Sequence, residues 1–221
     1  MAEETGVGAF FDVDGTLTRT TIVHYYVDWA TQNMGPFWKA LWLAGFAPMG
    51  AYYIVLDRFS REAFVRSFYR RYQGVRQEEL EGFLENQFER YSRPRIYPEA
   101  EEAIRGHREQ GHKIFLISGG LEPRVRPIAK YLSADDFAAT RLEIRDGIFT
   151  GEIEGRPIVD DEKVNRIRQL AKKHGIDLKK SYAYGDSRSD LSILKAVGHP
   201  RVVGKGISGM ARKLGWEPPQ W

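Results

Sequence analysis

The chain has 221 residues, which is enough for one or two domains with a sizeable hydrophobic core. Hydrophobic residues at 42% and charged residues at 29% exclude a disordered chain, and the absence of cysteine excludes disulfides, cysteinyl zinc sites, iron-sulfur clusters and thiol nucleophiles. The net charge of +3 is too small to indicate nucleic acid as a partner.

The N-terminal part of the chain predicts a buried strand that ends in acidic residues. Residues 1–8 carry two glutamates and no basic stretch followed by an apolar one, so we expect no secretory signal and a cytoplasmic protein. An apolar run up to Phe11 leads to Asp12, and Gly15 then breaks the pattern. A strand and a turn are therefore predicted over residues 6–20.

Residues 21–93 predict a helical segment, because they contain many aromatic and arginine residues and few strand signals. Phe64 and Phe68, for example, lie four residues apart, which is the spacing of one helix face. The uncharged stretch at residues 40–56 is at the short end of what spans a bilayer. An amphipathic or buried helix pair, bent at Pro48, is favoured over a transmembrane helix.

From residue 98 onward, helical and strand patterns alternate. Helices are predicted at residues 99–110, 122–132, 161–174 and 189–197, strands at 113–117, 182–184 and 201–203, and a hairpin at 140–153. This alternation predicts an α/β fold with a doubly wound, mainly parallel sheet. In such a sheet the functional site lies beyond the carboxyl ends of the strands.

The first polar cluster at a strand end runs from Asp12 to Thr18. Asp12 and Asp14 are two residues apart on an extended chain, so their carboxylates point to the same face. Like charges this close repel each other, which favours a bound cation or a raised pKa on one carboxyl group. The alternative is a solvated turn, but a turn would not need an apolar strand that delivers two carboxylates into a crevice.

Two further polar clusters follow later strands. Ser118, Gly119 and Gly120 precede a predicted helix, where free backbone amides and a hydroxyl bind anions, although a simple glycine turn is equally compatible with them. Asp186 and Asp190 lie one helical turn apart and on the same side. Capping of the helix by Asp186 or Ser187 is the alternative role, and it is compatible with metal binding.

The carboxylates together predict the kind of metal. Oxygen ligands suit a hard cation, and the chain has no cysteine and no pair of histidines at ligand spacing. The set Asp12, Asp14 and Asp186 therefore favours Mg²⁺ over zinc.

Four short motifs occur in order along the chain: Asp12-Val-Asp-Gly-Thr-Leu-Thr18, Ser118-Gly119, Lys163, and Gly185-Asp186 with Asp190. They resemble the motifs of the haloacid dehalogenase superfamily, in particular the phosphoserine phosphatase-like hydrolases of its subfamily IB. The resemblance spans nearly the whole chain. It implies a Rossmann-like core domain of residues 1–20 and 94–221, and a helical cap domain of residues 21–93 inserted after the first strand.

The resemblance implies a phosphatase that forms an aspartyl-phosphate intermediate. Asp12 would be the nucleophile. Asp14 would be the general acid that protonates the leaving group and then activates water. Mg²⁺ would be held by Asp12, Asp186 and Asp14, the last through its main-chain carbonyl, and would offset the repulsion between the phosphate and the nucleophile.

The same resemblance implies how the phosphate is held. Ser118, the amide of Gly119 and Lys163 would contact the phosphoryl oxygens as negative charge spreads over them. Asp190 would orient the metal site or Lys163 from behind.

The substrate depends on the cap, where this sequence departs from the serine-specific members of the family. Thr21 and Ile22 lie where those members carry a glutamate that binds the substrate ammonium. Arg66 or Arg70 is the candidate partner for a substrate carboxylate, and a solvated basic face is their alternative role. We therefore expect a small-molecule phosphomonoester that is small or amphiphilic. Phosphoserine, or a lipid phosphate hydrolysed at a membrane surface, is the alternative.

The first half of the cap is unusually aromatic, with Phe37, Trp38, Trp42, Phe46, Tyr52 and Tyr53. These residues form the core of the cap, line an apolar pocket or contact a membrane. A binding protein without turnover is a further alternative. Such a protein would be free to lose Asp14 or Lys163, and both are present.

Overall fold

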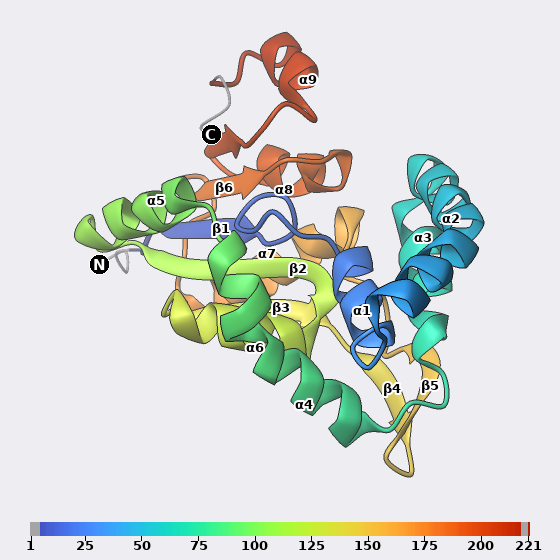
Figure 1. Ribbon diagram of the computed structural model, residues 1–221. Coiled ribbons are helices and arrows are strands. Elements are labelled where there is room, and N and C mark those ends of the chain that lie inside the picture. Colours follow the sequence, from blue (N-terminus) through green and yellow to red (C-terminus); the bar gives the residue numbers. More distant parts are fainter. Residues whose placement is uncertain (1–4, 218–220) are drawn as a thin grey trace.

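The computed structural model describes residues 5–217 and 221 (Figure 1). Its centre is a five-stranded sheet in the order β3-β2-β1-β6-β7, in which neighbouring strands are parallel. The strands are β1 (Gly8–Asp12), β2 (Lys113–Leu121), β3 (Asp136–Thr140), β6 (Tyr182–Gly185) and β7 (His199–Val202). The predicted doubly wound parallel sheet is therefore confirmed.

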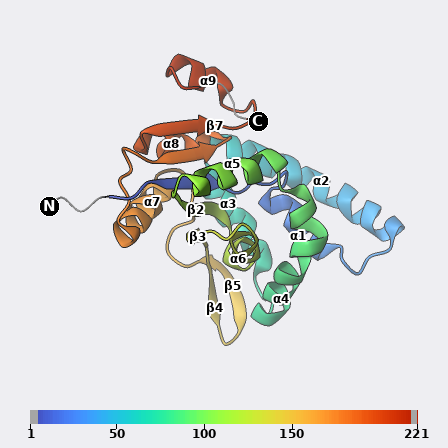
Figure 2. The ribbon, with the colours of Figure 1, turned by 90° about the vertical axis from the view of Figure 1, so that its left-hand side faces the viewer.

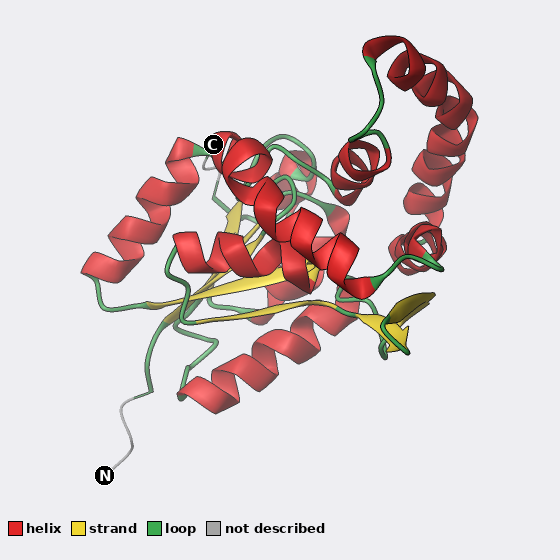
Figure 3. Ribbon diagram, turned by 60° about the horizontal axis from the view of Figure 1, so that its bottom comes forward, coloured by secondary structure: helices red, strands yellow, loops and turns green. Residues whose placement is uncertain are grey.

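Helices cover both faces of this sheet (Figure 3). One face packs against α5 (Pro98–Glu109) and α6 (Glu122–Tyr131), and the other against α7 (Asp160–His174), α8 (Leu191–Ala196) and α9 (Ser208–Lys213). Each face of the sheet has a hydrophobic cluster, the first against α5 and α6 and the second against α7, α8 and α9. Because side chains alternate along a strand, Phe11 of β1 packs into the first cluster and Phe10 into the second. Both side chains are fully buried, as expected for a central parallel strand.

A helical segment lies between β1 and α5. It contains α1 (Ile22–Ala30), α2 (Pro36–Phe59), α3 (Arg61–Tyr69) and α4 (Gln77–Gln87). The segment shares a third hydrophobic cluster with the antiparallel hairpin β4 (Leu142–Arg145) and β5 (Ile148–Ile153), which was predicted around Asp146-Gly147. The division into a core of residues 1–20 and 94–221 and a cap of residues 21–93 remains our proposal. The shared cluster indicates that the hairpin packs with the cap.

Helix α2 corrects the prediction of a bent or buried helix pair. It is one helix of 24 residues that continues past Pro48, and Tyr53 is its one buried residue. Pro48 is exposed, so water can bind the carbonyl that proline leaves without a partner. The helix is long and apolar enough, by length and composition alone, to cross a membrane, with a mean hydropathy of 1.3 in its most apolar window. Figure 2 shows α2 projecting from the rest of the molecule.

Strand β2 corrects the predicted position of the second polar cluster. It continues to Leu121, and α6 begins only at Glu122. Ser118 therefore lies within the strand and not at a helix N-terminus. Strand β3 was missed because its sequence, from Asp136 to Thr140, has neither a β-branched run nor clear alternation; parallel pairing with β2 forms it.

Candidate active site

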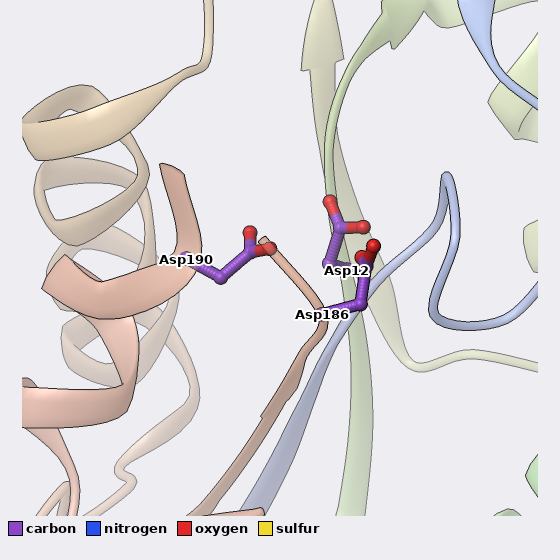
Figure 4. Close-up of side chains that lie close together, drawn as sticks. All are labelled: Asp12, Asp186 and Asp190. Carbon is purple, nitrogen blue, oxygen red and sulfur yellow. The ribbon is translucent and has the colours of Figure 1, made fainter. Parts of the chain in front are cut away.

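Three carboxylates meet at the carboxyl edge of the sheet (Figure 4). Asp12 ends β1, Asp186 follows β6, and Asp190 ends the short 3-10 turn before α8. One side-chain oxygen of each lies within 4.8 Å of the others. Burial and the neighbouring carboxylates raise the pKa of Asp12 well above its ordinary value and the pKa of Asp186 to about 6. This concentration of carboxylates, two of them buried and one half-buried, favours a bound cation.

Lys163 brings one positive charge to this group from α7. Its Nζ donates hydrogen bonds of 2.5 Å to Oδ1 of Asp12 and to Oδ1 of Asp190, and all three side chains are at most 5% exposed. Burial alone would raise the pKa of Asp190, but the ammonium group and hydrogen bonds from Ser187 hold this pKa below its usual value. Because Ser187 donates its amide and hydroxyl to Oδ2, both oxygens of Asp190 are engaged. Asp190 is therefore placed to support Lys163.

The carboxylate oxygens that remain available for a metal belong to Asp12 and Asp186. The hydroxyl of Thr16 donates to Oδ1 of Asp186 at 2.9 Å. Among residues 5–217 no hydrogen bond reaches Oδ2 of Asp186 or Oδ2 of Asp12. Hard oxygen donors of this kind, beside a single buried ammonium group, fit Mg²⁺. The carboxylate of Asp14 is engaged elsewhere, so its predicted metal contact would have to be made by its main-chain carbonyl.

Arg124 on α6 forms a buried ion pair with Asp14 that the sequence did not predict. Nη1 and Nη2 of Arg124 donate to Oδ1 and Oδ2 of Asp14, both at 2.6 Å, and the two side chains are 2% and 9% exposed. The guanidinium carbon lies 4.4 Å from the centre of the Tyr25 ring, and Nη2 lies 3.5 Å from Oγ of Ser118. A side chain on Gly120 would clash with this guanidinium group, so the second glycine of the motif makes room for it.

Ser118 and Gly119 are held rigidly on the predicted phosphate side of the site. Ser118 is fully buried, and its Oγ accepts a hydrogen bond of 2.9 Å from the amide of Gly120. The carbonyl of Gly119 accepts one of 2.8 Å from the hydroxyl of Tyr69 on α3. The strand therefore fixes this motif from the core side, and a residue of the helical segment fixes it from the other.

A cavity of about 150 Å³, here called the active-site cavity, joins the core residues to the helical segment. The core contributes Asp12, Asp14, Gly15, Gly119, Val159, Lys163, Asp186, Ser187 and Ser189, and the helical segment contributes Thr21, Ile22, Arg61 and Val65. The structure thus brings nearly all of the predicted catalytic, phosphate and metal residues to one cavity. Ser118 and Asp190 lie behind its lining.

Of the predicted substrate residues, Thr21 lines the active-site cavity, whereas Arg66 and Arg70 do not. Arg66 pairs with Glu62, and Arg70 pairs with a glutamate of the hairpin. The reason is helix phase: Arg61 and Val65 are four residues apart and share the face of α3 that meets the cavity. Arg66 on α3 and Arg70 in the 3-10 turn that follows α3 therefore lie off the face that meets the cavity.

Comparison with known proteins matches the chain to a family and to curated relatives. A family model described as haloacid dehalogenase-like hydrolase matches residues 9–195. The chain is 38% identical over 125 residues to a probable phosphatase of Mycobacterium tuberculosis, which covers 56% of this chain and 43% of that protein. It is 32% identical over 120 residues to a phosphoserine phosphatase of Streptococcus thermophilus, covering 54% of this chain and 56% of that protein. The match thus spans about half the length of these curated relatives.

The overall arrangement also occurs in a solved structure. A protein of unknown function from Bordetella pertussis superimposes with a TM-score of 0.80 and 26% identity. The superposition covers 98% of this chain and 100% of that chain. The helical segment and the sheet therefore occur together in both molecules.

Proposed function

Since the chain belongs to the haloacid dehalogenase-like hydrolases, we propose that it hydrolyses phosphomonoesters through a phosphoryl group carried on Asp12. The observation that supports this most directly is the position of the Asp12 carboxylate, which faces the active-site cavity beside the buried ammonium group of Lys163. Bound Mg²⁺, held by Asp12, Asp186 and the main-chain carbonyl of Asp14, would offset the repulsion between the phosphate and the attacking carboxylate. The names of the two curated relatives support the same reaction class.

Asp12 and Asp14 would divide the chemistry between them. First, a carboxylate oxygen of Asp12 attacks phosphorus, the bond from phosphorus to the leaving oxygen breaks, and Asp14 gives its proton to that oxygen. Water then attacks phosphorus, Asp14 takes a proton from the water, and the bond from phosphorus to Asp12 breaks. The bidentate pair with Arg124 is made with the carboxylate form of Asp14, which is the form that the second step needs. For the first step, Arg124 must release one of these oxygens so that it can carry the proton.

Ser118, Gly119 and Lys163 would hold the phosphoryl oxygens. Lys163 is already beside the nucleophile, so its charge would act where negative charge spreads during transfer. Asp190 would act by keeping Lys163 in place, because it binds the same ammonium group from the side away from the substrate.

The helical side of the active-site cavity favours a substrate without an ammonium group. Thr21, Ile22 and Val65 are uncharged and Arg61 is cationic, so in the described part of the chain this side contributes no carboxylate. A substrate ammonium would lack an anionic partner there, whereas an additional anionic or polar group would meet Arg61. We therefore propose a small or amphiphilic organic phosphate. Phosphoserine, the substrate in the name of one relative, is the alternative.

Phosphate release from a panel of phosphomonoesters tests this function. The panel contains phosphoserine, sugar phosphates, phosphocholine and a lysolipid phosphate, each with Mg²⁺ and with EDTA. We expect release that EDTA abolishes, and a loss of at least about a thousandfold in Asp12→Asn. Asp146→Asn, at the exposed hairpin turn, is the matched control and should retain activity. Absence of release from every ester, or an Asp12→Asn variant about as active as its parent, would overturn the proposal.

A further inference from the structure

Helix α2 exposes a concentration of large apolar side chains. Fourteen such side chains are exposed in the described part of the molecule, and nine of them lie on α2: Phe37, Trp38, Leu41, Leu43, Met49, Tyr52, Ile54, Val55 and Phe59. Their exposure is high, at 73% for Ile54 and 84% for Phe59. We call these nine residues the α2 apolar surface. Contiguous apolar surfaces of this kind mark contacts with another molecule or a membrane.

The opposite side of α2 is fixed to the rest of the helical segment. Trp42 and Phe46 stack with ring centres 5.0 Å apart, and both contact Tyr26 of α1. Tyr53 packs edge to face on Phe68 of α3, at 5.3 Å. These aromatic contacts fix the side of α2 that carries Trp42, Phe46 and Tyr53 to α1 and α3, so the helix is not free to cross a bilayer on its own. Its surface is instead presented sideways over the roughly 36 Å that 24 residues span.

Two observations indicate that a bilayer, and not a second copy of the chain, covers the α2 apolar surface. The α2 apolar surface extends around the helix, since Leu43 and Ile54 lie about 100° or more from Phe37 and Val55 by helix phase. A flat protein surface would cover one stripe, whereas lipid fills the space on every exposed side. The second observation is charge: residues 34–76 contain seven Lys and Arg against two Asp and Glu, although the whole chain is only +3. This local positive charge complements anionic headgroups.

We propose that the α2 apolar surface docks into the interfacial region of an anionic membrane. Between Lys39 and Asp57 the helix carries no charged residue, and Lys39 and Arg58 lie near its two ends. The apolar side chains would enter the boundary between headgroups and acyl chains, and the flanking cations would contact the headgroups. The binding requires no catalytic residue and therefore stands independently of the proposed function.

The position of Arg61 connects this surface to the active-site cavity. Arg61 lines the cavity, and its Nη1 donates to Oδ1 of Asp57 on α2 at 2.9 Å. A membrane bound along α2 would thus lie near a residue that lines the cavity of Asp12. If the proposed function holds, the substrate class within reach is an amphiphilic phosphomonoester whose apolar chain remains in the bilayer, and this part of the inference rests on that function.

Flotation of the full chain with lipid vesicles tests the docking. We expect binding to phosphatidylcholine vesicles that contain phosphatidylglycerol, and weaker binding to pure phosphatidylcholine or at high salt. Leu41→Glu and Ile54→Glu should each weaken the binding about tenfold or more, because each removes a large apolar side chain from the membrane boundary and places a negative charge there. Leu214→Glu, at an exposed apolar residue far from α2 in sequence, is the matched control and should bind like the parent. Circular dichroism checks that each variant is folded.

Three results would overturn the docking. One is the absence of binding to either kind of vesicle, and another is an equal loss of binding in Leu214→Glu. The third is a dimer in sedimentation that Leu41→Glu dissociates while vesicles do not bind, which would assign the surface to a second copy. Asp12→Asn should bind vesicles like the parent, so a failure of the proposed chemistry and a failure of the docking are told apart.

Discussion

At the scale of single residues, the pair between Arg124 and Asp14 is the feature that most affects the proposed chemistry. Arg124 holds both oxygens of Asp14 at once, whereas lysine at this position would bind as a point charge. We expect Arg124→Lys to slow the release of an alkyl leaving group about tenfold to hundredfold, because the proton donor is then mispositioned. Release of p-nitrophenolate, which leaves without a proton, should slow much less.

Single-turnover rates of leaving-group release for the two esters measure this difference. Arg126→Lys is the control, since Arg126 lies on the same helix but is half exposed and pairs with surface glutamates. Gly120→Ala should reproduce the effect of Arg124→Lys, because a methyl group there would displace the guanidinium. Equal losses for both esters would show that Arg124 does not position the proton donor.

The difference between Asp186 and Arg124 shows which site residues a sequence can reveal. Asp186 was predictable because it follows an apolar strand directly, and strand ends of a parallel sheet meet at one edge. Arg124 lies six residues beyond Ser118 on a helix with one other arginine, and its contact with Asp14 depends on the rotation of that helix. Arg61 was missed for the same reason. The sequence of α3 alone does not indicate which face of the helix meets the cavity.

At the scale of secondary-structure elements, α5 is joined to β6 through a buried histidine. Nε2 of His107 lies 2.9 Å from the hydroxyl of Tyr184, and its Nδ1 lies 2.8 Å from Nδ1 of His112. Burial, with the nearby His112 and Arg201, lowers the pKa of His107 to about 4 from an ordinary 6.5. His107 is therefore protonated near pH 6.5 in the unfolded chain, but only near pH 4 in the folded chain.

This pKa difference predicts the sign of a pH dependence. Neutral His107 contributes up to about 3 kcal/mol to the free energy of unfolding. This contribution is fully present above pH 6.5 and is lost as the pH falls toward 4. Urea unfolding at a series of pH values should show His107→Gln losing less stability than the parent over this interval. His199→Gln, at an exposed histidine, should follow the parent. Parallel curves for His107→Gln and the parent would contradict the assignment.

The elements themselves were predicted where local pattern decides them. The helix that ends before Gly175 and the hairpin around Asp146-Gly147 follow from residue types that tolerate a positive φ, and the structure has both. Strand β3 was missed because pairing with β2, and not its own composition, forms it. Residues 40–56 were expected to form a helix pair bent at Pro48 because proline weakens a helix, but α2 continues past Pro48, which is exposed to water.

At the scale of the whole molecule, a metal at the carboxylates should stabilise the fold. A ligand that binds only the folded chain adds about 2.7 kcal/mol at a hundredfold excess over its Kd, which is a rise in Tm of roughly 5 °C or more for a chain of this size. We expect Mg²⁺ to produce such a rise, and Asp186→Asn to remove most of it. Without metal, Asp186→Asn should be at least as stable as the parent, because it removes one of several crowded carboxylates.

Differential scanning fluorimetry with and without Mg²⁺ measures both effects. Asp146→Asn supplies the control, since it removes a carboxylate at an exposed turn and should keep the full metal-dependent rise. A rise of the same size in Asp186→Asn and in the parent would place the metal elsewhere.

Fluorine NMR with beryllofluoride tests whether Asp12 carries the phosphoryl group, without any assumption about the substrate. Beryllofluoride binds a carboxylate as a mimic of a phosphoryl group, so the test needs only the nucleophile and its surroundings. With Mg²⁺, the parent protein should show bound-fluorine signals at one equivalent per chain, as should Asp146→Asn. Asp12→Asn should show none. Signals that persist in Asp12→Asn, or that never appear in the parent with Mg²⁺, would show that Asp12 is not the residue that carries the phosphoryl group.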